Sequence, residues 1–418
     1  MSVALVDEAN PRVPGDISLW RARWLLLRYG SAMVVPPQGI EATGQTELLA
    51  LVGEVAERVG VAKPDAVLLA GTGTIRGWAH RSRRILVVGL PLLQCLPVDE
   101  IRALVAHELA IVHHRRPHLV ARLRGLHEAA IEPLLHDAPL SRKSRAVLRV
   151  TEAFASALEQ KADQAAASAS GLHTAARAVV KADLAEFEFT DLVFDLEEQV
   201  WKHTGACVQD VHAGWQAAID SGAISVELDA DTRAALMSRH PFLASAIAPL
   251  RVEHVRLAQP SGLVALQPLP EAAEQALARQ ALNRDCRKWT TFAEVPPAAW
   301  PSWIFRQAKE ITDQVGLLLG REPANAAEVV SVLVTRMPEL VAANWPNQPV
   351  DPDQLDGTPS VMLVAEAELT RRGWRRLHPA VAGVLVNDDN VQHNLHDLAH
   401  RAASDFEALN ALMDLLED

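Results

Sequence analysis

The stretch IRALVAHELAIVHHRR, residues 101–116, decides how the rest of the sequence is interpreted. Its apolar residues recur at the three- and four-residue spacing of a helix that buries one face: they are Ile101, Leu104, Val105, Leu109 and Val112. Asp99 and Glu100 precede them, where negative charge suits the N-terminus of a helix. The pattern predicts an amphipathic helix.

A possible metal-binding pair, His107-Glu108, stands at the centre of this helix. In the zinc motif His-Glu-x-x-His, two histidines four residues apart share one ion and the Glu is the general base. Here Ile111 occupies the second histidine position. His114 lies roughly 10 Å further along the axis, too far to share an ion with bonds of roughly 2 Å. Together with His113, it is predicted to belong to a solvated helix end.

Two later segments carry further polar residues that are candidates for a functional site. Glu159 and Asp163 lie four residues apart in the alanine-rich stretch SALEQKADQAA, so they share one face of a predicted helix. Further on, His240 is followed by a proline in the segment Ser-Arg-His-Pro.

With these three segments in this order, the chain resembles the gluzincin peptidases of metallopeptidase family M forty-eight, the CAAX-prenyl-endopeptidase and HtpX-like group. The resemblance covers roughly residues 20–255 and implies an α+β, mainly helical, zincin-like fold with a small sheet. It implies that His107 and Glu159 are zinc ligands, that Glu108 is the catalytic base and that Asp163 orients a zinc histidine. It also implies that the substrate pairs with an edge strand near residues 75–79.

Two departures from the family fall on functional positions. Ile111 replaces a zinc ligand, so the predicted metal site is incomplete. The family's His-Pro histidine, here His240, and an Arg six residues later contact the substrate and the developing oxyanion; here the Arg position is Ala246. Zinc is therefore expected to bind weakly or not at all, and the chain is predicted to be an inactive pseudopeptidase that acts as a binding or regulatory module.

Two alternatives remain open. The chain could be an active soluble zinc metalloendopeptidase with a non-standard third ligand, for which His113, His114 and His240 are the candidates. It could also bind metal in the tail, where His396 and His400 have the i, i+4 spacing and His393 is near. That tail segment lacks a Glu base, and a polar helix surface is the predicted structure.

Composition excludes several classes of protein. The net charge of −12 over 418 residues argues against a nucleic-acid binder, which leaves a protein or peptide as the expected partner. Three distant cysteines, Cys95, Cys207 and Cys286, predict a reducing compartment without disulfides. We find no signal peptide and no apolar run near the ~20 residues that span a bilayer. The expected location is the cytoplasm.

The chain is predicted to form two domains, a peptidase-like domain at 1–257 and a mostly helical C-terminal domain at 271–418, joined by a Pro- and Gly-containing linker. The heptad-spaced aromatics Phe187, Phe194 and Trp201 are expected in a core. The first domain is predicted to contain a helix at 47–61 and buried strands at 66–70 and 85–88. Expected in the second are helices at 271–282, 303–319, 326–342, 365–377 and 391–416 and strands at 360–364 and 381–386.

Overall fold

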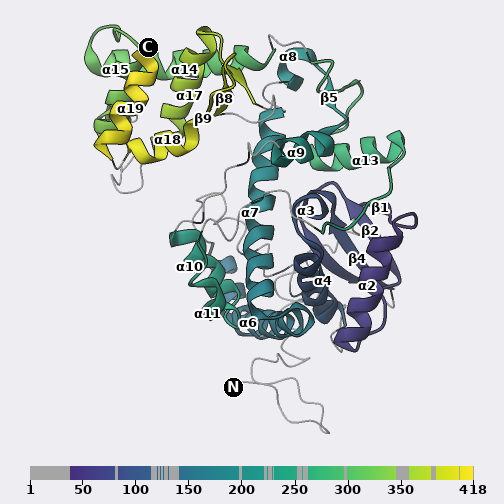
Figure 1. Cartoon of the computed structure of the whole chain (residues 1–418). Coiled ribbons are helices and arrows are strands. Elements are labelled where there is room, and N and C mark those ends of the chain that lie inside the picture. Colours follow the sequence, from purple (N-terminus) through teal and green to yellow (C-terminus); the bar gives the residue numbers. More distant parts are fainter. Residues whose placement is uncertain are drawn as a thin grey trace. The chain divides into compact units, whose positions relative to one another are not determined.

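A computed structural model gives the three-dimensional structure of the chain (Figure 1). It describes residues 38–417 except 81–82, 114–119, 121–122, 124–125, 127–129, 131–140, 197–199, 221–223, 225–227, 229, 252–256, 258–261, 296–298, 345–356, 378–382 and 404. The described part is α+β and mainly helical, as predicted, and it falls into two compact units. The first unit takes its described residues from Met1–Phe189 and Val226–Asn283, and the second from Thr190–Ser225 and Arg284–Asp418.

A four-stranded sheet forms one part of the first unit, in the order β1-β2-β4-β3. Strand β2 pairs in parallel with β4, while β1 and β3 are antiparallel to their neighbours. The predicted strands are present, and β3 lies at the edge of the sheet, where the resemblance expects an edge strand. The bounds are β1 (Ile40–Glu41), β2 (Ala66–Ala70), β3 (Ile75–His80) and β4 (Arg83–Gly89).

The motif helix is α4 (Val98–Val112), and it packs against strands β3 and β4 of the sheet. It also contacts α2 (Thr46–Val59) and α6 (Arg142–Ser170). A short helix, α3 (Leu90–Cys95), connects β4 to α4. This packing brings one end of the motif helix to the edge strand and its side to the long alanine-rich helix α6.

The first unit ends later in the chain than the predicted boundary at 258–270. Its last helix, α13 (Glu271–Ala281), contacts β1 and β2, so it does not begin a second domain. The stretch before α13 is tied to the first unit, because the side chain of Gln45 bonds both backbone groups of Gln267 and Glu47 accepts from the amide of Ala265. Hydrogen bonds therefore hold residues 263–270 to the first unit, and this segment is not a free linker.

A disulfide between Cys207 and Cys286 corrects the prediction of unpaired cysteines. It lies beside two short parallel strands, β5 (Cys207–Val208) and β6 (Trp289–Thr290), and beside Arg284, which stacks over Trp201. These contacts explain why the segment from residue 190 belongs with the second unit. Cys95 is free, and burial raises the pKa of its thiol far above its ordinary value.

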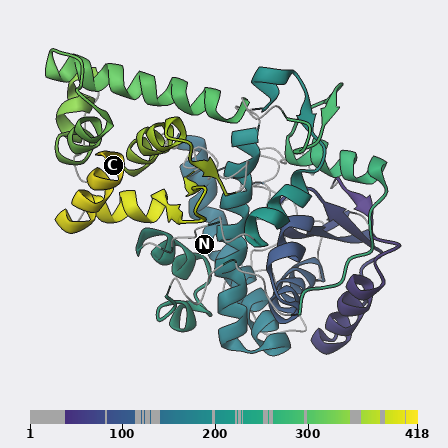
Figure 2. The same cartoon turned by 45° about the horizontal axis from the view of Figure 1, so that its top comes forward.

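Helices dominate the rest of the second unit, and Figure 2 shows its yellow-green and yellow helices side by side. A small antiparallel sheet, β7-β8-β9, lies among them. The predicted strand at 360–364 is wrong, because these residues lie inside α17; a short apolar run does not distinguish a buried strand from a buried helix. The elements are α14 (Ala299–Leu319), α15 (Ala326–Thr335), α16 (Met337–Asn344), α17 (Thr358–Arg371), β7 (Arg375–Arg376), β8 (Val384–Val386), β9 (Gln392–Asn394), α18 (Leu395–Ala402) and α19 (Phe406–Glu417).

The aromatic stripe on α7 (Leu172–Leu196) and just beyond it is not part of a core. Phe187 and Phe194 are 63% and 58% exposed, and Trp201 is 38% exposed. Phe189 and Leu192 are buried instead, so the heptad spacing follows the outer face of the helix. Among the described residues, no helix has the length and apolarity needed to cross a bilayer.

Candidate metal centre

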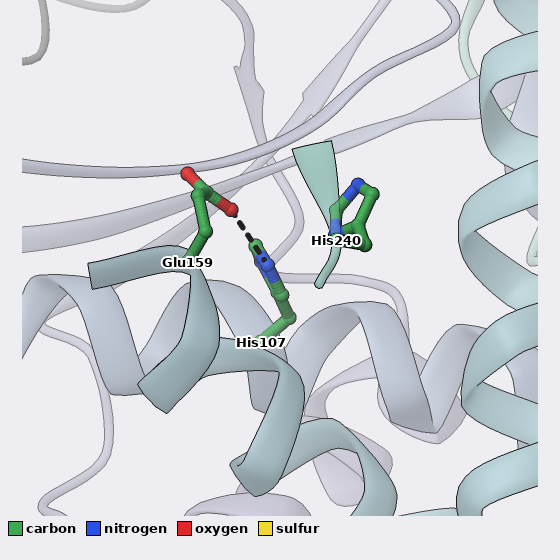
Figure 3. Close-up of side chains that lie close together, drawn as sticks. All are labelled: His107, Glu159 and His240. Carbon is green, nitrogen blue, oxygen red and sulfur yellow. Dashed lines mark ion pairs between the residues drawn. The ribbon is translucent and has the colours of Figure 1, made fainter. Parts of the chain in front are cut away.

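Three elements of the first unit bring His107, Glu159 and His240 together. His107 projects from α4, Glu159 from α6, and His240 follows directly after α10 (Ala230–Arg239). The amide of His240 donates to the carbonyl of Leu236, which continues the helical bonding pattern by one residue. Figure 3 shows the imidazole of His107 between the other two side chains.

The spacing of these groups is that of a metal site. Each of the three residues offers one ligand atom, and these atoms lie within 4.8 Å of one another. Nε2 of His107 is 3.1 Å from Oε2 of Glu159, and the two imidazole centroids are 5.8 Å apart. Both histidines are buried, while the Glu159 side chain is 20% exposed, which leaves a route for an ion to enter.

Carboxylates dominate the electrostatics around His107. Desolvation on its own lowers the pKa of this imidazole, but the Glu108 and Glu159 carboxylates outweigh it and raise the pKa well above its ordinary value. The surroundings therefore favour a positive charge at this position. A metal ion can supply that charge in place of the proton, which is released when the metal binds.

Glu108 lies on the opposite side of the His107 ring from Glu159. Its Oε1 is 3.3 Å from Nδ1, and its Oε2 accepts a 2.7 Å hydrogen bond from the amide of Gly77 in the edge strand. Gly77 permits this approach, because an added Cβ would lie 2.4 Å from Cγ1 of Val112. Glu108 thus occupies the place of a carboxylate that orients a metal-binding histidine from behind.

The donor set fits a zinc ion or a similar divalent transition metal. Two imidazoles and one carboxylate form a ligand set common in zinc proteins. Nε2 of His107 is buried and faces Oε2 of Glu159, so both atoms are directed toward the position that an ion would occupy. His107, Glu159 and His240 would hold the ion, which would supply a Lewis acid.

Sequence reasoning placed His240 on the substrate side, and in the structure one of its ring nitrogens lies within 4.8 Å of ligand atoms of His107 and Glu159. No local signal indicated this, because 77 residues separate it from Asp163, its hydrogen-bond partner. The contact between His240 and Asp163 of α6 forms only in the folded chain. The Ser-Arg-His-Pro segment marked His240 as functional without indicating its position.

The two replaced family positions are both apolar and buried. Ile111 is 3% exposed and packs in a cluster with Leu158 and Ala162 of α6. Ala246, in α11 (Ala244–Ile247), is 1% exposed. The surroundings of Ile111 are apolar.

The other candidate histidines lie outside this centre. Nδ1 of His113 contacts the carbonyl of Leu109 just after α4, and its side chain is half-buried and not solvated as predicted. His114 lies outside the described residues. In the second unit, His396 and His400 are exposed on α18. Within the residues that the structure describes, no third ligand joins them in a metal-sized group.

Comparisons with protein-family models, with curated proteins and with solved structures found no match. The role of the centre therefore follows from its own geometry and chemistry.

Proposed function

We propose that this chain is a metallopeptidase-like protein that binds zinc at His107, Glu159 and His240, has no peptidase activity, and acts as a binding or regulatory module. The proposal includes a gluzincin-like first unit. That part is supported by the motif helix α4 packed on an edge strand and by α6, which carries the Glu and Asp of the second motif.

The orientation of Glu108 carries the proposal. The two nitrogens of an imidazole point away from each other, and Glu108 lies at Nδ1 while Glu159 lies at Nε2. A general base must reach a water held on the metal side of the ring. Glu108 instead lies behind His107 and holds the amide of Gly77. This arrangement suits metal retention and does not suit the activation of water.

Ala246 supports the same proposal. The resemblance implies an Arg at this position on the oxyanion side, and removal of one such stabilising group can lower the rate ~10²–10³-fold. Ala246 is buried, so an Arg introduced at this position could not reach a substrate unless the surrounding side chains repacked.

One observation favours an active zinc endopeptidase as the second candidate. His240 brings the number of clustered ligands to three, which is the number in catalytic zinc sites that keep a position for water. Glu108 is also adjacent to His107. In this second function a rotation of Glu108 toward the metal side of the ring would precede catalysis.

Zinc content and proteolysis separate the two functions. We expect the purified wild-type chain to retain about one zinc per molecule, since three clustered ligands bind catalytic zinc in other proteins. His240→Ala should lower the affinity at least ~100-fold, given about 3 kcal/mol for each ligand. His173→Ala, which changes an exposed histidine on α7, is the matched control and should leave affinity unchanged.

Casein and a mixed peptide library are the substrates for the activity test. We expect no cleavage by the zinc-loaded wild type. Cleavage that disappears in Glu108→Gln would establish the endopeptidase function instead. Full zinc retention by His240→Ala would show that His240 is not a ligand and would remove the proposed centre.

A further inference from the structure

Asp163 is the most deeply buried polar group at the centre. It lies on α6 one turn after Glu159, and its side chain is 0% exposed. Its Oδ1 is 2.9 Å from Nδ1 of His240 and 3.6 Å from Nε2 of His107. One carboxylate oxygen thus lies beside ring nitrogens of both histidines.

Three of the distances among these atoms are close to the edge length of a zinc coordination tetrahedron. Bonds of about 2.0–2.1 Å place neighbouring ligand atoms about 3.3 Å apart in a tetrahedron. The contacts that join Glu159 to His107, His107 to Asp163 and Asp163 to His240 measure 3.1, 3.6 and 2.9 Å. The four atoms therefore form a chain in which each step has the length of a tetrahedral edge.

Hydrogen bonding leaves Asp163 incompletely satisfied. Its Oδ2 is buried and makes no hydrogen bond within the described residues. A buried carboxylate that lacks partners is unfavourable unless a positive charge lies nearby. A divalent cation next to Oδ1 offsets the combined charge of Asp163 and Glu159.

We infer, resting on the metal site proposed above, that Asp163 is the fourth zinc ligand and closes the coordination sphere. The ligand atoms are Nε2 of His107, Oε2 of Glu159, Nδ1 of His240 and Oδ1 of Asp163. Two metal bonds then replace the hydrogen bond between Oδ1 of Asp163 and Nδ1 of His240. Structural zinc sites have four protein ligands, whereas catalytic sites keep one position for water or substrate. This centre is therefore a structural joint between α4, α6 and the end of α10.

Cobalt spectroscopy on the full chain tests closure. Co²⁺ substituted for zinc absorbs visible light, and its spectrum changes when an added anion enters an open coordination position. We expect azide to leave the wild-type Co²⁺ spectrum unchanged. In Asp163→Ala a position opens, so azide should change the spectrum, and zinc affinity measured against a chromophoric chelator should fall at least ~100-fold. Glu152→Gln, at an exposed position of the same helix, is the matched control.

Asp163→Asn separates a ligand from a residue that only positions His240. The amide oxygen of Asn can still accept the hydrogen bond from Nδ1, but it is a poor zinc ligand. We expect Asp163→Asn to behave like Asp163→Ala. A variant that binds zinc about as tightly as wild type and keeps its Co²⁺ spectrum would overturn the inference, and so would an azide response in the wild type.

The outcomes keep the two proposals apart. If the wild-type chain holds no metal, the proposed function fails. If it holds the metal and azide enters, only closure fails. Should Asp163→Ala not fold, as judged by circular dichroism, the azide response of the wild type and the affinity of Asp163→Asn still decide the result.

Discussion

Two helices of this molecule carry histidines in patterns typical of zinc proteins, and they differ in surroundings. Helix α18 has the favourable i, i+4 spacing at His396 and His400, yet both are exposed, and in the described chain no third ligand joins them. Helix α4 lacks that spacing, because Ile111 stands four residues after His107, yet His107 is buried beside candidate ligands from two other elements. A metal site thus depends on the convergence of elements more than on spacing within one helix.

The largest expected effect tests this comparison directly. His107→Ala should lower zinc affinity at least ~100-fold, which is about 3 kcal/mol or more, because it removes the central ligand. The double variant His396→Ala/His400→Ala, which removes the better-spaced pair, should retain about one zinc per chain. Isothermal titration with zinc measures both variants. Loss of zinc from the double variant would reverse the comparison.

The two units should also differ in the interactions that stabilise each of them. The disulfide closes a loop across 79 residues in the second unit, and its removal by Cys207→Ser/Cys286→Ser should lower the free energy of unfolding by about 2–3 kcal/mol. Chemical denaturation measures this change. A phosphine reductant should destabilise the wild type and have no effect on the double variant. Cys95→Ala, which keeps the disulfide, should respond to the reductant as wild type does.

Restoring the spacing on α4 should not improve the site. Ile111→His places an imidazole in the apolar cluster with Leu158 and Ala162, so we expect a loss of about 2 kcal/mol in unfolding free energy. Zinc stoichiometry should stay at about one. Ile111→Val, which keeps the position apolar, should lose only about 1 kcal/mol. An increase in zinc affinity in Ile111→His would show that position 111 still faces the metal.

The smallest expected effect concerns Glu186, a carboxylate of the first unit that lies outside the candidate metal centre. Burial raises the pKa of Glu186 to about 6, and Asp183 adds to this while Arg239 and Arg76 oppose it. The folded chain then binds this proton more tightly than the unfolded chain does. The resulting stability is fully present below pH 4.5 and is lost as the pH rises through about 6. Glu186→Gln should flatten this part of the curve of unfolding free energy against pH, and an unchanged slope would contradict the assignment.

Local patterns in the sequence predicted the elements around the site. Apolar periodicity indicated the motif helix, and runs of branched residues indicated strands β2 and β4. Exposure was harder to predict, because the heptad spacing of Phe187 and Phe194 suits an outer face as well as an inner one. Periodicity shows that one side of a helix is distinct, and tertiary packing decides which side is buried.

Features that join distant parts of the chain could not be predicted from local patterns. Three features link residues far apart in sequence: the contact of His240 with Asp163, the disulfide between Cys207 and Cys286, and the hydrogen bonds of Gln45 to Gln267. Contacts between residues that are 77, 79 and 222 positions apart cannot be predicted from a short stretch of sequence. Each of them requires the fold itself.

The interrupted first unit has a consequence for biosynthesis. Asp163 leaves the ribosome well before His240, which follows 77 residues later, and the intervening segment includes residues assigned to the second unit. At roughly 5–20 residues per second, His240 is added about 4–15 s after Asp163. Residues 263–270 and helix α13, which complete the first unit, are translated later still. A nascent chain therefore presents His107, Glu159 and Asp163 before His240 is available. Under the proposed function, the full ligand set forms late in the maturation of this protein.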